Sequence, residues 1–148
     1  MEDFSNSVMI ALLPITSDWC KIELPHVTLV YAGEITDLKP TVFNEMAKAT
    51  ASLAFKYEPV LVKVIGMDIF GEEEQVEVLL LDPSIALRAM RYEVESWNAS
   101  THPFKPHATV GPVGSIDFVI PNSIGFDRIA FAWGDVRLTF ELGTGIMI

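Results

Sequence analysis

Two short segments of the chain carry the same residue pattern, Pro-His-x-Thr followed by an apolar residue. The first is Pro25-His26-Val27-Thr28-Leu29 and the second is Pro106-His107-Ala108-Thr109-Val110. Both segments have apolar residues at alternate positions and β-branched residues between them, which is typical of half-buried strands. Any fold of this chain therefore has to accommodate two similar strands, each carrying a histidine two residues before a threonine.

A regular strand places alternate side chains on opposite faces of its sheet. For the first motif, the residues expected together on one face are His26, Thr28 and Val30, and those on the other are Val27, Leu29 and Tyr31. The second motif places His107 and Thr109 on one face in the same way. Each motif is thus expected to present an imidazole and a hydroxyl to the same small volume.

The rest of the chain predicts further strands and two long helices. One helix begins near Asp37 and Pro40 and runs to about Tyr57; the other is capped by Asp82, starts at Pro83 and reaches about Asn98. The further strands are expected at Val8–Ile15, Pro59–Ile65, Gln75–Leu81 and Ile116–Ile120, and in two runs that meet at Gly134-Asp135. This order predicts an α+β fold with antiparallel sheets and one helix in each half.

The composition of the chain bears on its number of domains and on the cellular compartment that we expect for it. The 148 residues contain no low-complexity stretch, so we expect a single domain over residues 1–148. The single cysteine, Cys20, cannot form an internal disulfide, and the acidic residues near Met1 do not resemble a secretory signal. The longest apolar run, Val8–Ile15, is too short to cross a bilayer. We therefore expect a cytoplasmic protein that does not associate with membranes.

The net charge restricts the class of partner. With 20 acidic and 10 basic side chains the chain carries a net charge of −10. Binding to duplex DNA or long RNA depends mostly on lysine and arginine neutralising phosphates, so such partners are disfavoured. A small nucleotide held in a pocket is compatible with this charge, because a few cations and neutral donors suffice for one phosphate.

The paired motifs suit the cleavage of a phosphodiester. An imidazole titrates at about 6.5, so one histidine can act as a base and the other as an acid near neutral pH. The threonine hydroxyls can donate hydrogen bonds to the non-bridging phosphate oxygens. The chemistry requires no metal or cofactor, and we expect none. The sequence leaves open which histidine is the base, and whether water or a 2′-hydroxyl attacks.

On these residues the chain resembles the two-histidine (2H) phosphoesterases. Their signature is two His-x-Thr/Ser-apolar motifs roughly eighty residues apart, and here the two histidines lie 81 positions apart. The resemblance implies a bilobal α+β fold in which two antiparallel sheets line a cleft, with the helices outside. It also implies that His26 and His107 are the catalytic pair and that Thr28 and Thr109 bind the phosphate.

One position departs from the pattern of many RNA-processing members, which have an arginine three residues after the second threonine. This chain has Pro112 there. The missing cation and the acidity make the chain more similar to small bacteriophage 2H proteins, some of which degrade the cyclic oligonucleotide messengers of host immunity. That similarity implies an anti-defence enzyme acting in the host cytoplasm.

Four residues near the motifs are further candidates for substrate binding. Lys105 alternates onto the face of His107 if the strand extends that far, where it can neutralise phosphate; a solvated lysine is the alternative. Tyr31, Trp19 and Phe104 can stack on nucleobases, with packing in the core as the alternative.

The sequence therefore predicts a metal-independent phosphodiesterase acting on a small nucleotide, such as a cyclic oligonucleotide or a 2′,3′-cyclic phosphate. Two other functions stay open. One is RNA end processing, either as an RNA 2′,3′-cyclic phosphodiesterase or as a 2′-5′ RNA ligase-like enzyme. The other is a role without catalysis, as a nucleotide-binding sponge or an acidic interaction protein.

Overall fold

The computed structural model describes residues 6–16, 18–21 and 26–148. This part of the chain contains seven strands and two α-helices in an α+β arrangement. Their bounds are β1 Ser7–Pro14, β2 Val27–Glu34, α1 Pro40–Lys56, β3 Val60–Phe70, β4 Val76–Leu81, α2 Ile85–Val94, β5 His107–Pro112, β6 Ser123–Trp133 and β7 Val136–Glu141. One 3-10 turn precedes α1 (Ile35–Asp37) and another follows α2 (Glu95–Trp97).

The strands form one connected path in the order β2-β1-β6-β3-β4-β5, with β7 paired to β6. All of the pairs are antiparallel, which confirms the predicted sheet type. The two halves of the path share β3, whose residues 60–63 pair with β6 and whose residues 64–70 pair with β4. The two expected sheets are therefore joined through one long strand.

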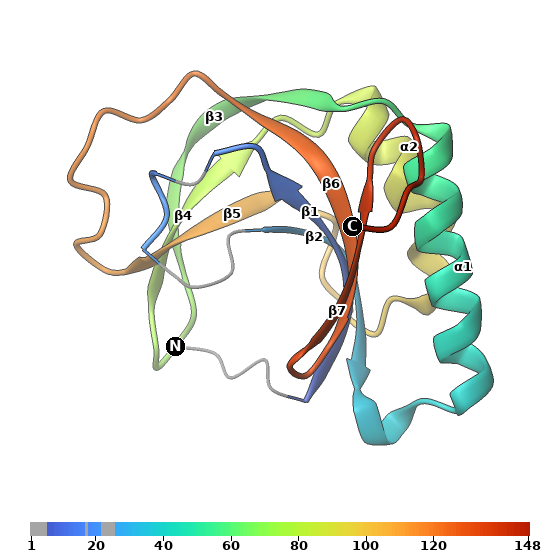
Figure 1. Cartoon of the computed structure of the whole chain (residues 1–148). Coiled ribbons are helices and arrows are strands. Elements are labelled where there is room, and N and C mark those ends of the chain that lie inside the picture. The colour runs from blue at the N-terminus through green and yellow to red at the C-terminus, as the bar shows by residue number, and fades with distance from the viewer. Residues whose placement is uncertain (1–5, 17, 22–25) are drawn as a thin grey trace.

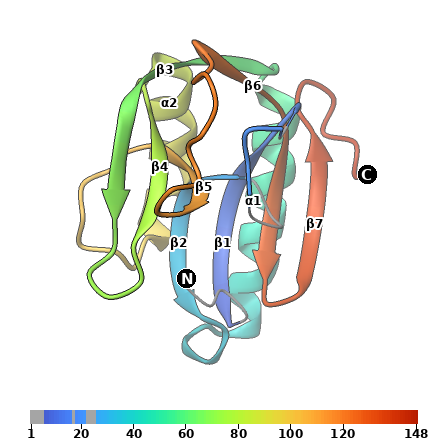
Figure 2. The same ribbon diagram turned by 90° about the vertical axis from the view of Figure 1, so that its left-hand side faces the viewer.

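The two ends of this path come together. β2 and β5 have no common neighbour in the strand order, yet they contact each other because the sheet curls round. Figure 1 shows the curl from the side, with α1 and α2 outside it. In the view of Figure 2, β2, β4 and β5 lie on the same side of the molecule. This closure brings together two strands that are far apart in sequence.

The main core lies between the strands and the helices. α1 buries Met46, Leu53 and Ala54, and α2 buries Leu87, Met90 and Val94. Above β6, the ring of Phe43 from α1 lies 6.0 Å from the rings of both Phe131 and Trp133. These aromatic contacts fix α1 against the middle of the sheet.

The helices agree with the sequence in position but not in every boundary. α1 begins at Pro40, as expected, because proline suits the first turn of a helix. The predicted cap of α2 was wrong: Ser84, not Asp82, accepts a hydrogen bond from the Leu87 N–H. Ile85, the first residue of α2, is 89% exposed although it is apolar. Neither helix, nor any other in the described residues, is long and apolar enough to cross a membrane.

Two strand predictions also need correction. The segment Ile116–Ile120 is not a strand, so the described part of the chain has seven strands where about eight were expected. β3 runs five residues beyond the expected end at Ile65, as far as Phe70. There the hairpin turns at Gly71, whose φ of +101° suits glycine.

Candidate active site

The first motif lies in a strand with two irregularities. The pairing of β1 with β2 skips Leu29 and Ala32, which have no residue directly opposite them. As a result Val30 turns into the core, where it is 1% exposed, and Tyr31 pairs with Met9 on the other face. The expected placement of Val30 and Tyr31 was therefore wrong, since the shifts reverse the alternation after Thr28.

Thr28 lies on the face of β2 that turns away from the main core. It pairs with Ala11 of β1, and its hydroxyl lies 4.0 Å from the sulfur of Met9. Met9, Ala11 and Ala132 form a small buried apolar cluster that is separate from the main core. Thr28 is thus a half-buried hydroxyl beside apolar side chains.

The second motif follows the predicted alternation closely. Ala108 and Val110 are fully buried in the main core, at 0% exposure. His107 and Thr109 alternate with them and are half-buried. Thr109 pairs with Val78 of β4, so both side chains lie on the same face of the sheet.

The curl of the sheet brings the two motifs to one region. His26 directly precedes β2, and His107 is the first residue of β5. Because β2 contacts β5, the two strands that follow or carry these histidines lie side by side, although the histidines are 81 positions apart in the sequence. Pro25, the first residue of the first motif, lies outside the described residues.

The imidazole of His107 has defined neighbours. Its Nδ1 lies 2.9 Å from the carbonyl oxygen of Lys105, and since a carbonyl only accepts, Nδ1 carries the hydrogen. The ring of Phe70, from β3, lies 4.7 Å from the His107 ring at an interplanar angle of 69°. This edge-to-face arrangement is a favoured geometry for aromatic rings.

Lys105 joins the same group of residues. Its Nζ lies 5.4 Å from the centre of the Phe70 ring and 3.6 Å from Oδ2 of Asp68. Lys105 thus lies close to the second motif although β5 begins only at His107. Asp68 and Phe70 were not among the sequence candidates, because the predicted strand stopped at Ile65. The alternating run up to Gly71 was the signal that could have included them.

The three aromatic candidates have different surroundings. Trp19 packs in the main core and is 7% exposed, which supports the core alternative for this residue. Phe104 packs against the same core, with the Arg91 guanidinium 5.0 Å from its ring centre. Tyr31 is half-buried on the face of Thr28 and donates a hydrogen bond to Glu34 at 3.0 Å.

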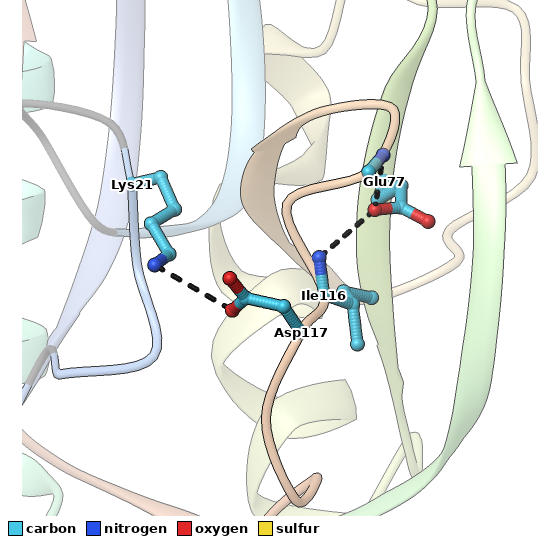
Figure 3. A network of polar contacts seen from close by, with 5 residues as sticks. Lys21, Glu77, Ile116 and Asp117 are labelled. Atoms are coloured by element: carbon cyan, nitrogen blue, oxygen red, sulfur yellow. Dashed lines mark hydrogen bonds and ion pairs between the residues drawn. The ribbon is translucent and has the colours of Figure 1, made fainter.

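A polar network fixes the chain on either side of the motifs. The carboxylate of Glu77, 7% exposed, accepts hydrogen bonds from the N–H groups of Gly114 at 2.8 Å and Ile116 at 2.9 Å. Lys21, which precedes the first motif, donates its N–H to the Val110 carbonyl at 2.7 Å. Its Nζ lies 3.6 Å from Oδ1 of Asp117. Figure 3 shows this ion pair beside the contact of Glu77 with Ile116. Lys21 is therefore bound both to the strand that carries His107 and to the loop that follows that strand.

Pro112, where many RNA-processing enzymes of the resembled family have arginine, is exposed at the end of β5. Its carbonyl accepts a hydrogen bond from the Ser115 N–H at 3.0 Å, so it belongs to the turn that leads into the loop held by Glu77. Among residues 6–16, 18–21 and 26–148, no group of three or more His, Cys, Asp or Glu side chains is arranged to hold a metal ion.

No protein-family model and no curated protein matches the sequence, but solved structures match the fold. The protein TT0787 of Thermus thermophilus has a TM-score of 0.63 at 14% identity, over 93% of this chain and 98% of that one. Kluyveromyces marxianus Usb1 with uridine monophosphate has a TM-score of 0.63 at 12% identity, over 93% and 99%. A structure described as a phosphoesterase has a TM-score of 0.54 at 14% identity, over 97% and 93%.

The chain therefore shares the α+β fold of these solved structures, one of which is described as a phosphoesterase. This agrees with the resemblance in the two motifs. Identities of 12–14% support the shared fold and do not by themselves carry over an activity.

Proposed function

We propose that the chain is a metal-independent phosphodiesterase that cleaves a small nucleotide phosphodiester, with one of His26 and His107 as the general base and the other as the general acid. One observation carries the proposal: His26 directly precedes β2 and His107 begins β5, and these are the two end strands that the curl of the sheet brings into contact. If the repeated motif were only a pattern of core strands that happened to occur twice, there would be no reason to expect its two copies on strands that contact each other.

The chemistry depends on the substrate. If a 2′-hydroxyl attacks, one imidazole takes its proton while the new P–O2′ bond forms. The other imidazole gives a proton to the leaving 5′-oxygen as the P–O5′ bond breaks, and the product is a 2′,3′-cyclic phosphate. If water attacks a cyclic phosphate, the base takes the water proton and the acid protonates the leaving ribose oxygen. Both histidines then return to their starting states by exchange with solvent.

His107 exchanges its proton through Nε2 in this mechanism, because Nδ1 donates to the Lys105 carbonyl at 2.9 Å. A fixed hydrogen bond at one ring nitrogen defines which tautomer the neutral ring adopts, and so which nitrogen reacts. The hydroxyls of Thr28 and Thr109 donate to the non-bridging oxygens, and Lys105 supplies a positive charge beside them.

We further propose that the substrate is small, a cyclic oligonucleotide or a 2′,3′-cyclic phosphate. The net charge of −10 repels long polyanions, while a single phosphate needs few cations. The uridine monophosphate in the Usb1 structure supports a nucleotide-sized ligand for this fold. The biological setting that we propose is cytoplasmic destruction of a cyclic oligonucleotide immune messenger by a phage anti-defence enzyme. It rests on the resemblance to small phage members.

The test is turnover with EDTA present, measured against cyclic mono-, di- and trinucleotides and an RNA ending in a 2′,3′-cyclic phosphate. His26→Ala and His107→Ala should each reduce kcat by about a hundredfold or more, the usual scale of acid–base catalysis. His102→Ala is the matched control, because the third histidine is exposed and lies outside both motifs. It should retain full activity.

The outcomes separate the competing functions. Turnover that survives both motif substitutions would refute the two-histidine mechanism. Activity confined to the RNA substrate would favour RNA end processing over a small-molecule substrate. Tight binding of a cyclic nucleotide without any turnover would favour a nucleotide sponge.

A further inference from the structure

We propose that Phe70 is a positioning residue, which holds the imidazole of His107 in the orientation that presents Nε2 to the substrate. The inference rests on the proposed function for its catalytic consequence, but its structural part can be tested without any substrate. It assigns a role to the end of β3, which contains neither motif.

The pairing of the strands places Phe70 on the correct face. Asp68 of β3 pairs with Val78 of β4, and Val78 pairs with Thr109 of β5. Directly opposed residues of an antiparallel sheet lie on the same face, so Asp68 shares its face with Thr109. Phe70 lies two residues after Asp68 and points the same way. The hairpin end of β3 therefore extends across the side of the sheet that carries the second motif.

Two contacts together restrict the tautomer and the orientation of the His107 ring. The hydrogen bond from Nδ1 to the Lys105 carbonyl, at 2.9 Å, selects one tautomer and one of the two flipped orientations. The Phe70 ring, 4.7 Å away at 69°, restricts the plane of the imidazole. A half-turn of the imidazole would replace Nδ1 by a carbon at the carbonyl and lose the hydrogen bond. Because proton transfer requires aligned donor and acceptor atoms, a ring held in one orientation reacts more often.

Phe70 is itself held in place. The ammonium group of Lys105 lies 5.4 Å from the centre of the Phe70 ring, within the range of a cation–π contact, and is 3.6 Å from the Asp68 carboxylate. Lys105 thus contacts His107 through its carbonyl and Phe70 through its side chain. His107, Phe70, Lys105 and Asp68 thus form one connected set of contacts. Removal of the Phe70 ring would take away its contacts with both His107 and Lys105.

The experiment compares Phe70→Leu, which keeps an apolar side chain but removes the ring, with Phe70→Tyr, which keeps the ring. Ile69→Ala is the matched control, because Ile69 is the neighbouring residue on the opposite face of β3 and is 44% exposed. Nitrogen NMR of ¹⁵N-histidine-labelled protein, at a pH of about 8.5 where imidazole is neutral, reports the tautomer. The signals of His107 are assigned as those that are absent from the spectrum of the His107→Ala variant.

We expect the wild type, Phe70→Tyr and Ile69→Ala to show His107 with hydrogen on Nδ1, and Phe70→Leu to show a mixture of tautomers. The kcat of Phe70→Leu should fall about three- to tenfold with KM within about twofold, and Phe70→Tyr should restore it. An unchanged tautomer in Phe70→Leu would overturn the inference even if the enzyme is active. So would a rise in KM at constant kcat, which would indicate a contact with the substrate. A wild type without turnover would refute the proposed function, while the NMR result would still decide the inference.

Discussion

The hydroxyl of Tyr57, at the end of α1, donates a hydrogen bond of 2.6 Å to the carboxylate of Glu93 on α2. Lys56 donates to the other carboxylate oxygen at 3.0 Å. The hydrogen bond to Glu93, followed by burial and the negative charge of Glu93, raises the pKa of Tyr57 to about 12. Burial tends to raise the pKa of Glu93, but the hydrogen bonds from Tyr57 and Lys56 outweigh it and lower that pKa. This contact joins the two helices.

We expect Tyr57→Phe to lower the free energy of unfolding by about 1 kcal/mol at pH 7, as for one partly exposed hydrogen bond to a carboxylate. Urea titrations at several pH values measure it, and Tyr92→Phe, on a tyrosine that is 75% exposed, is the control.

The sign of the pH dependence follows from the two pKa shifts. The stabilisation from Tyr57 is fully present below its ordinary pKa of 10.0 and is lost as the pH rises through about 12. The stabilisation from Glu93 is present above its ordinary pKa of 4.5 and is lost as the pH falls through its lowered pKa in the folded state. The difference between wild type and Tyr57→Phe should therefore narrow at both extremes. A difference that is constant from acid to alkali would contradict this role.

Replacement of the motif threonines should affect catalysis more than folding. Thr109→Val keeps the shape of a half-buried side chain and removes its hydroxyl, so we expect kcat/KM to fall about ten- to a hundredfold. Thr28→Val should behave similarly, while Thr109→Ser should retain most of the activity. Steady-state kinetics and the Tm of each variant separate the two effects. Full activity in both valine variants would exclude the hydroxyls from phosphate binding.

Glu77 should prove important for stability. Glu77→Ala removes the acceptor for two backbone N–H groups in a buried position, and we expect a loss of about 2–3 kcal/mol in the free energy of unfolding. Glu73→Ala, in the exposed turn of the β3–β4 hairpin, should change it by less than about 0.5 kcal/mol. Urea unfolding of both variants makes the comparison. Equal free energies of unfolding for Glu77→Ala and Glu73→Ala would show that the hydrogen bonds from the loop after β5 to Glu77 do not stabilise the fold.

The positive charge of Lys105 should strengthen substrate binding. Because the side chain is 60% exposed, we expect Lys105→Met to raise KM only about three- to tenfold and to weaken its dependence on salt. Lys105→Arg should preserve both. Lys48→Met, on an exposed lysine of α1, is the control for net charge. A salt dependence that is identical in Lys105→Met and wild type would show that this ammonium does not meet the phosphate.

The sequence predicted those parts of the fold that depend on local patterns. Pro40 and the apolar stripe behind it define α1, and the alternation of His107 with Ala108 defines the face of β5. The sequence could not indicate the two register shifts in β2, because Leu29 and Ala32 fit a regular strand equally well. Those shifts depend on contacts with β1, and they decide which face Tyr31 occupies.

The candidate site, like the fold, could be predicted from the sequence only in part. The repeated frames made both histidines and both threonines candidates, since their pattern is local and occurs twice. Phe70 and Asp68 could not be found from the frames, because they reach His107 and Lys105 only through the pairing of β3 with β4 and of β4 with β5. Ser84 was missed for a simpler reason: Asp82-Pro83 is itself a good start for a helix, and α2 begins shortly after it, at Ile85.

The contact between β2 and β5 has a consequence for how the chain folds. These two strands stand at opposite ends of the strand path, so their contact joins segments that are distant both in the sequence and in the sheet. Contacts between residues distant in sequence are costly in chain entropy and form late. Recovery of the proposed phosphodiesterase activity after dilution from urea should accordingly lag behind the recovery of secondary structure, so that this activity would report completed folding of the whole chain.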